Sequence, residues 1–270
     1  MKNISSLQDN RAFLYGDAVF ETVKILDNKI LFLEDHYFRL MASMRILRME
    51  IPMNFTMEFF ENELISKAKA ENIETSARAR ITVYRKDGGY YLPENNNVDY
   101  LISVSEIKQP LYQIEKLNYE VDIYKDFYVS KQLLSTLKTT NRLINSIGSI
   151  YANENNLDNC ILLNEEKSVI ETLNGNIFML KDGVLSTPPI ADGCINGVMR
   201  KQILALAKTI DKIEVKETTI SPFDLQKADE LFITNIIKGI QPITKYRKKE
   251  FETNFSNLLL TKLNTKIRLG

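Results

Sequence analysis

The chain has 270 residues, of which 44% are hydrophobic and 26% are charged, with 35 basic residues against 35 acidic ones. These proportions are typical of a soluble globular protein, and the length suffices for one large domain or two of ordinary size. Because positive charge is not in excess, the composition does not favour binding to nucleic acid or to an anionic membrane surface.

The first third of the chain predicts alternating strands and helices. Asp27-Asn28 separates two apolar segments and is typical of a tight hairpin turn. In the second of two helical patterns, Phe59, Leu64 and Ala68 are the expected inward residues. The predicted elements are, in order, strands at 18–26 and 29–35, helices at 36–49 and 55–73, and strands at 77–86 and 98–107.

Gln109-Pro110 interrupts the strand pattern and is the expected domain boundary. We therefore predict an N-terminal domain at 1–108, a linker at 109–115 and a C-terminal domain at 116–270.

The second part predicts further antiparallel hairpins and two helices. Thr139, Thr140 and Asn141 are residue types that cap helices, and apolar residues at helical spacing follow them. Asp182-Gly183 lies between two apolar runs and indicates another hairpin. The predicted elements are an extended segment at 127–137, a helix from about 142, strands at 160–164, 169–180 and 184–189, a helix at 197–210, and a strand and loop at 231–244. The fold class is mixed α and β, with hairpins rather than βαβ repeats.

Several common enzyme types are disfavoured by the residue inventory. His36 is the single histidine, Cys160 and Cys194 are far apart in the chain, and a zinc site is therefore not expected. The cysteines are expected to be free thiols, because the amino-terminal residues lack the apolar core of a signal peptide and the chain is expected to be cytoplasmic. No GxSxG, Walker A or GxGxxG motif is present. If the chain is an enzyme, a cofactor is expected to supply its chemistry.

Four features suggest which cofactor. Lys138 lies directly before a predicted helix, in LKTTNRLINSIG, and Glu171 lies in a predicted apolar strand, SVIETLNGNIF. The stretch CINGVMRKQIL opens a helix with a glycine, which leaves backbone N–H groups for an anion such as phosphate. Arg39 could add a positive charge to that phosphate site. Each feature alone also has an ordinary explanation, as a surface lysine, edge carboxylate, loop junction or helix-surface arginine.

Together these features suit pyridoxal 5′-phosphate. The lysine would form a Schiff base with the aldehyde, the acid would hold the ring nitrogen protonated, and the helix opening would bind the phosphate.

Motifs along almost the whole chain resemble those of the class IV aminotransferases, the fold-type-IV pyridoxal-phosphate enzymes. The resemblance is carried by FLYGDAVFETVKI, EDHYFRL, LKTTNRL, SVIETLNGNIF, VLSTPP, NGVMR and ADELFITNIIKGIQPI. It implies an α+β fold similar to D-amino-acid aminotransferase, with a small α/β N-terminal domain and a larger barrel-like α/β C-terminal domain. It also implies a homodimer, with Lys138 bound to the cofactor and Glu171 facing the pyridine nitrogen. Arg39 and the backbone N–H groups of Val198 and Met199 would hold the phosphate.

Within that family, three details are more similar to aminodeoxychorismate lyase than to transaminases. They are NRL after the lysine, NGVMR in place of a G-I-T-R segment, and TNIIKGIQP at 234–242. An aminotransferase of branched-chain or D-amino acids, using 2-oxoglutarate, is the alternative, because VFET with Glu21 is common among transaminases. A binding protein without catalytic activity is a third, more remote, hypothesis.

The substrate residues are predicted from strand alternation. Arg80 and Tyr84 share one face of the strand at 77–86, whereas Arg85 points to the other. Arg80 and Arg142 are the candidate partners for substrate carboxylates, and Tyr15 and Tyr84 are candidates to line the site. An exposed, charged strand is the alternative explanation for the strand residues. His36 is interpreted as structural.

Overall fold

The computed structural model describes residues 8–73 and 75–269, and the chain divides into two compact units. Unit 1 comprises Met1–Pro110 and Leu137–Asn141, and unit 2 comprises Leu111–Thr136 and Arg142–Gly270. The division after Pro110 lies within the predicted linker. The short segment Leu137–Asn141 belongs to unit 1, although the sequence analysis placed it in the C-terminal domain.

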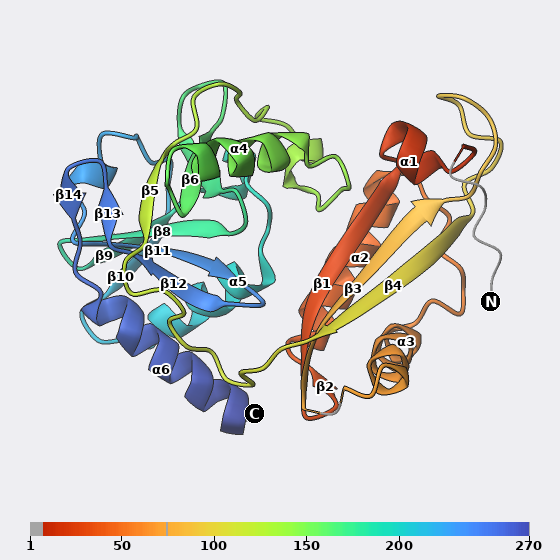
Figure 1. Ribbon diagram of the computed structural model, residues 1–270, viewed down its shortest axis with the longest axis horizontal. Coiled ribbons are helices and arrows are strands. Elements are labelled where there is room, and N and C mark those ends of the chain that lie inside the picture. Colours follow the sequence, from red (N-terminus) through yellow and green to blue (C-terminus); the bar gives the residue numbers. More distant parts are fainter. Residues whose placement is uncertain (1–7, 74, 270) are drawn as a thin grey trace. The chain divides into compact units, whose positions relative to one another are not determined.

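Unit 1 is an antiparallel sheet with helices on one face (Figure 1). Its strands run in the order β2-β1-β3-β4 and are β1 (Ala18–Leu26), β2 (Lys29–Ile30), β3 (Ser76–Arg85) and β4 (Val98–Glu106). Its helices are α1 (Arg11–Tyr15), α2 (Leu33–Ile46) and α3 (Met57–Ala70). Alternate side chains of β1 and β3, such as Val23 and Ile81, pack against Leu40, Phe60 and Leu64 of the helices. This alternation leaves Phe20 and Arg80 on the opposite face of the sheet.

The predicted turn at Asp27-Asn28 is present, with φ of 49° and 59° at the two residues. A type I′ hairpin turn has positive φ at both of its central residues, and Asp and Asn tolerate such values. The second strand is shorter than predicted, because Phe32 adopts a φ of 56° and α2 begins at Leu33. In α3 the fully buried aromatic residue is Phe60, while the predicted Phe59 is partly buried.

Unit 2 contains two five-stranded sheets (Figure 1). One has the order β14-β13-β5-β6-β7 and consists of β5 (Glu120–Ile123), β6 (Asn159–Leu163), β7 (Val169–Thr172), β13 (Lys245–Tyr246) and β14 (Lys249–Glu250). The other has the order β10-β9-β8-β11-β12 and consists of β8 (Asn176–Lys181), β9 (Val184–Thr187), β10 (Glu214–Glu217), β11 (Glu230–Asn235) and β12 (Gly239–Ile243). One core cluster takes residues from both sheets, including Val121 and Ile161 from one, and Ile177 and Leu231 from the other.

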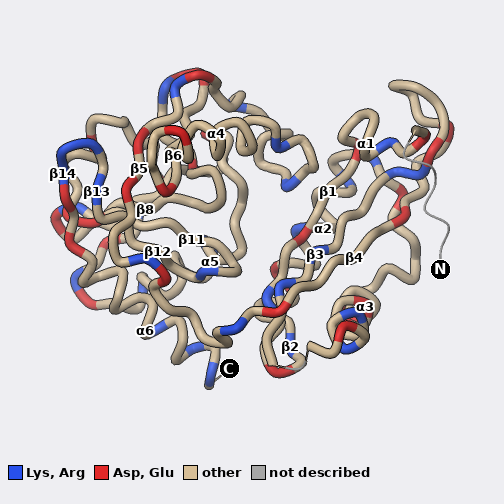
Figure 2. The backbone as a smooth tube through the Cα atoms, viewed as in Figure 1, with Lys and Arg blue, Asp and Glu red and all other residues tan. Residues whose placement is uncertain are grey.

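Three helices complete unit 2, namely α4 (Leu143–Glu154), α5 (Val198–Ala207) and α6 (Asn254–Leu269). The predicted hairpin at Asp182-Gly183 is present between β8 and β9. Three strand pairs are parallel, β5 with β6, β5 with β13, and β9 with β10, so the unit is not built from hairpins alone. Basic and acidic residues are interspersed along both units (Figure 2).

The approach to Lys138 differs from the prediction. The segment expected to be extended, 127–137, contains a 3₁₀ turn at Leu133–Thr136. The cap of α4 is Arg142, which makes no side-chain capping hydrogen bond. Thr140 and Asn141 donate instead to the carbonyl of Gly16, at 3.2 and 3.3 Å. These polar residues therefore tie the segment to unit 1 rather than start a helix.

Candidate active site

Lys138 is held at the beginning of β1 by main-chain hydrogen bonds. The N–H of Phe20 donates to the carbonyl of Lys138 at 2.8 Å, and the N–H of Thr140 donates to that of Ala18 at 3.0 Å. Val19 and Thr139 form an antiparallel bridge between them. The backbone of Lys138 is thus fixed as a short extra strand, while its side chain is half-buried.

Phe20 brings Lys138 close to a second predicted residue. The Lys138 Nζ lies 4.4 Å from the centre of the Phe20 ring, and the Arg80 guanidinium carbon lies 3.7 Å from it. Both distances are those of cation–π contacts. Arg80 also donates from Nε to the hydroxyl of Thr82, at 3.2 Å. Two cations are therefore oriented around one aromatic ring, on the face of the sheet opposite the helices.

On the other face of β1, Glu21 binds Arg39 and His36 of α2. The Arg39 guanidinium donates from Nε and Nη2 to the two carboxylate oxygens, each at 2.6 Å. The His36 Nδ1 lies 2.8 Å from Oε2 of Glu21. Glu21 and His36 are almost completely buried, and the Arg39 side chain is 15% exposed. The predicted phosphate ligand Arg39 is thus oriented by a carboxylate, and its role toward phosphate stays a prediction.

The charges of this cluster follow from its environment. Burial alone raises the pKa of Glu21, but the charge of Arg39 and the hydrogen bonds from His36 and Arg39 outweigh it and lower the pKa to about 2. Burial lowers the pKa of His36, and the positive charges of Arg39 and Lys138 act in the same direction. A neutral His36 then donates its Nδ1 proton to Glu21. This agrees with the structural interpretation of that histidine.

The other residues predicted for unit 1 lie on or beside the same sheet. Tyr84 is buried on β3, where burial raises the pKa of its hydroxyl. Tyr15 ends α1, and its ring lies 5.7 Å from that of Tyr91. Arg85 is directed away from Arg80, as the alternation predicted, and pairs with Asp17 at 2.9 Å.

In unit 2, Glu171 lies beside the opening of α5. Its Oε2 accepts a hydrogen bond from the N–H of Ile195 at 3.0 Å, and the residue is 5% exposed. Cys194 directly precedes Ile195 in the chain. Burial, together with the charge of the Glu171 carboxylate, raises the pKa of its thiol to about 12. Glu171 is therefore a buried acid, and its hydrogen-bond donor Ile195 lies three residues before the start of α5.

The N-terminus of α5 forms a narrow cradle. Gly197 is its cap, and Val198 and Met199 are the first two helical residues, both buried. The amide of Asn176 donates to the carbonyl of Ile195 at 2.8 Å. A Cβ atom at Gly197 would lie 2.0 Å from Oδ1 of Asn176, so a larger residue would require the Asn176 side chain to move. The helix N–H groups and their positive dipole end suit an anion such as phosphate.

Thr234 is a candidate that the sequence analysis missed. It pairs with Asn176 across β11 and β8, which places it next to the α5 opening. The residue is 1% exposed, and within residues 8–73 and 75–269 its hydroxyl has no hydrogen-bond partner. A buried hydroxyl without a partner is costly, and a bound phosphate oxygen would satisfy it. In the sequence, the hydroxyl of this threonine at the start of TNIIKGIQP was a signal for a polar site. Its position beside the α5 opening follows only from the strand pairing.

The predicted residues are distributed over both units. Those in unit 1 are Lys138, Arg39, Arg80, Tyr15 and Tyr84. Those in unit 2 are Glu171, Val198, Met199 and Arg142. Arg142 is partly buried at the start of α4. Their combination into one site stays a prediction.

Among the described residues, no group of three or more His, Cys, Asp or Glu side chains is arranged to hold a metal ion. Within the same residues, no helix has the length and apolar character needed to cross a membrane.

Known proteins resemble this chain over nearly its whole length. The profile of the amino-transferase class IV family matches residues 18–246. A protein of Methanocaldococcus jannaschii, named provisionally as a branched-chain-amino-acid aminotransferase, is 30% identical over 235 residues, which cover 87% of this chain and 80% of that protein. A D-alanine aminotransferase of Listeria monocytogenes is 28% identical over 239 residues, with the same coverage.

A solved structure from Legionella pneumophila, named provisionally as a 4-amino-4-deoxychorismate lyase, superposes with a TM-score of 0.84. It is 26% identical, and the match covers 95% of this chain and 93% of that one. The chain therefore belongs to the class IV aminotransferase family and is a pyridoxal-phosphate-dependent enzyme. The predicted family, α+β fold and cofactor are confirmed.

Proposed function

We propose that this enzyme is a 4-amino-4-deoxychorismate lyase, which releases pyruvate by β-elimination and forms 4-aminobenzoate, a precursor of folate. Support comes from the NRL, NGVMR and TNIIKGIQP segments and from the likeness to the Legionella protein over 95% of the chain. The observation that carries most weight is the placement of Lys138 and Arg80 over the same ring, Phe20.

The side chains in each unit suit the parts of pyridoxal phosphate. The α5 opening at Val198 and Met199, the Thr234 hydroxyl and Arg39 would hold the phosphate, and Glu171 would face the ring nitrogen. When bound, the cofactor supplies an electron sink for the carbanion at the amine-bearing carbon of the substrate.

Lys138 has two tasks in this scheme. Its ε-amine would hold the cofactor, and the same amine would accept the proton from the amine-bearing carbon of the substrate. The main-chain bond from Phe20 fixes its backbone, so the amine works from a defined position. Arg80, stacked on Phe20, would bind a substrate carboxylate beside that amine. Aminodeoxychorismate has two carboxylates, and Arg142 is the candidate for the second.

An aminotransferase acting on branched-chain or D-amino acids with 2-oxoglutarate is the second candidate. It is favoured by the relatives from Methanocaldococcus and Listeria, which share 30% and 28% of their aligned residues with this chain. Both reactions begin with the same proton removal by Lys138. They differ in whether the neighbouring group is then expelled.

A paired assay separates the two reactions. The purified holoenzyme is incubated with aminodeoxychorismate and 4-aminobenzoate is measured; a parallel sample receives branched-chain or D-amino acids with 2-oxoglutarate, and glutamate is measured. We expect product in the first assay. Turnover in the second assay without any in the first would refute the lyase assignment.

The covalent role of Lys138 has its own test. Borohydride reduction of the holoenzyme should fix the cofactor to Lys138, and mass spectrometry of the peptides should locate it. Lys138→Ala should carry no adduct, whereas a matched variant of an exposed lysine, Lys131→Ala, should carry it in full. An adduct at another lysine in the parent protein would contradict the assignment.

We also expect a homodimer, by resemblance to the family. Light scattering coupled to size-exclusion chromatography tests this directly, because a mass near the 31.2 kDa of one chain would contradict it.

A further inference from the structure

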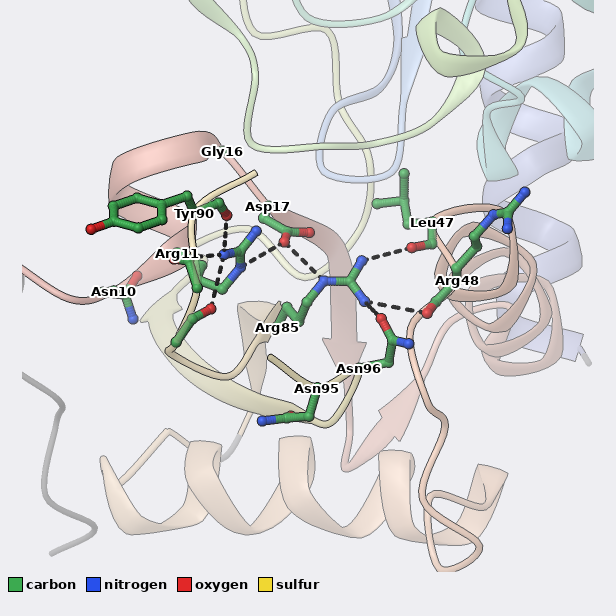
Figure 3. A network of polar contacts seen from close by, with 12 residues as sticks. Asn10, Arg11, Gly16, Asp17, Leu47, Arg48, Arg85, Tyr90, Asn95 and Asn96 are labelled. Carbon is green, nitrogen blue, oxygen red and sulfur yellow. Dashed lines mark hydrogen bonds and ion pairs between the residues drawn. The ribbon is translucent and has the colours of Figure 1, made fainter. Parts of the chain in front are cut away.

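A buried polar network lies at the end of unit 1 that carries α1 (Figure 3). At its centre, Oδ2 of Asp17 accepts from the Nε atoms of two arginines, Arg11 at 3.1 Å and Arg85 at 2.9 Å. The arginines are only 3% and 6% exposed. One carboxylate oxygen therefore joins two guanidinium groups that come from distant parts of the chain.

Arg11 directs its remaining donors to the loop between β3 and β4. Its Nη1 donates to the carbonyls of Gly88, Gly89 and Tyr90, at 3.1, 3.4 and 2.6 Å. Gly88 and Gly89 have φ of 113° and 73°, values that favour glycine, so the loop can turn its successive carbonyls toward one cation.

Arg85 holds the far side of the same loop. It donates to the side chain of Asn96 and, from Nη2 at 2.7 Å, to the carbonyl of Leu47 at the end of α2. A further bond, from Nη1 at 3.2 Å, reaches the carbonyl of Arg48. The network thus attaches both ends of the loop, 88–90 and 96, to α1, β1 and α2.

The tip of this loop has little apolar packing to hold it. Tyr90, Tyr91 and Leu92 are 84%, 92% and 84% exposed. Hydrophobic burial therefore contributes little to the position of the tip, and the directional hydrogen bonds of the network define it instead. The ring of Tyr91 in this tip contacts that of Tyr15, and the Arg11 guanidinium lies 4.9 Å from the Tyr15 ring.

We propose that Asp17, Arg11 and Arg85 are positioning residues, which fix this loop and its Tyr15–Tyr91 pair for binding of the amino substrate. That substrate role rests on the proposed function, in which Tyr15 lines the site. The network also reaches the Lys138 segment, because the carbonyl of Gly16, next to Asp17, accepts hydrogen bonds from Thr140 and Asn141.

The composition of the network supports positioning over simple stabilisation. Buried charges need hydrogen bonds to offset their lost hydration, and an apolar cluster of similar volume is often at least as stable. A fork of guanidinium bonds fixes angles as well as distances, and lysine cannot reproduce it. The arrangement is therefore suited to holding an exposed loop in one geometry.

The chain has no tryptophan, so a single one provides a specific reporter. We would place it as Leu92→Trp, at an exposed position that leaves Tyr91 and Tyr15 unchanged, and measure nanosecond fluorescence anisotropy in the full-length holoenzyme. Arg11→Met in this background removes the bonds to the loop, and Asp17→Asn removes the central charge. Arg48→Met is the matched control, because only its carbonyl takes part in the network and its side chain is exposed.

We expect the reporter to become clearly more mobile in Arg11→Met and to stay unchanged in Arg48→Met. Arg11→Lys should restore little of the lost loop order, because an ammonium group lacks the planar set of N–H donors of a guanidinium group. For whichever amino substrate the parent enzyme turns over, Arg11→Met should raise KM about tenfold and change kcat less than about twofold, since loop ordering would then accompany binding.

Unchanged anisotropy in a folded Arg11→Met protein would overturn the positioning role. A mobile loop with unchanged KM would overturn the substrate role. If Asp17→Asn does not fold, Arg11→Met still decides, because the ion pair between Asp17 and Arg85 at the start of β1 remains in that variant. The anisotropy comparison needs no substrate and therefore remains valid even if the lyase assignment fails.

Discussion

Replacing Glu21 by glutamine should destabilise the protein strongly at neutral pH. Glu21 is buried, and its pKa is lowered from 4.5 to about 2 by Arg39 and His36, whose effects outweigh burial. That difference corresponds to about 3 kcal/mol in favour of the folded state when the carboxylate is ionised. Glu21→Gln also leaves the mostly buried guanidinium of Arg39 without its carboxylate, which is itself destabilising. For a chain of this size, about 3 kcal/mol corresponds to a fall in melting temperature of roughly 10 °C.

The pH dependence has a defined sign. Because the pKa of Glu21 is lower in the folded state, its stabilisation is complete above the unfolded value of 4.5 and is lost as the pH falls toward about 2. The difference in melting temperature between parent and Glu21→Gln should therefore be largest near neutral pH and should shrink below 4.5.

Circular dichroism melts at one fixed cofactor concentration measure this effect. Glu71→Gln is the matched control, because that carboxylate is paired with Lys67 in the same unit but is exposed, and exposed pairs contribute little. A fall of less than about 3 °C in Glu21→Gln, or a difference that does not change with pH, would show that the cluster does not hold its charges as described.

Three further predictions concern unit 2. Thr234→Val should weaken cofactor binding about tenfold in an absorbance titration, because a hydrogen bond to a charged phosphate is lost; unchanged affinity would exclude the hydroxyl from the site. Gly197→Ala should weaken binding further, because its Cβ would lie 2.0 Å from Oδ1 of Asn176, and adding Asn176→Ala should recover part of the loss if that clash is the cause. Cys160 and Cys194, whose pKa values burial raises to about 12, should not react with a disulfide reagent at mildly alkaline pH until the protein is unfolded; rapid reaction in the native protein would contradict their burial.

Local features of the sequence predicted local structure well. Asp27 and Asn28 indicate a turn because both tolerate positive φ, and the turn is present. The helical patterns gave α2, α3, α4 and α5 to within a few residues. By contrast, Thr140 and Asn141 look like helix caps but bind the Gly16 carbonyl. Cap residues and loop anchors use the same side-chain chemistry, so only tertiary structure distinguishes them.

Long-range pairing accounts for most of what the sequence analysis missed. Lys138 was assigned to the C-terminal domain because it follows the predicted boundary at Gln109-Pro110. Its carbonyl instead accepts a hydrogen bond from the N–H of Phe20, more than a hundred residues earlier. The pairing of Thr234 with Asn176 is likewise a matter of strand register. One missed contact did leave a signal. Glu21 occupies an inward position between Val19 and Val23, and a charge there needs a buried partner.

The two faces of β1 differ in their charge. On the helix-covered face, the Glu21 carboxylate neutralises Arg39, and His36 is neutral, so that this side adds little net charge. On the face opposite the helices, Lys138 and Arg80 both contact the ring of Phe20. Burial and the neighbouring Arg78 lower the pKa of Arg80, but a guanidinium remains charged at neutral pH. Arg80 therefore keeps its positive charge beside Lys138 on this face, and in the proposed function that charge would bind a substrate carboxylate.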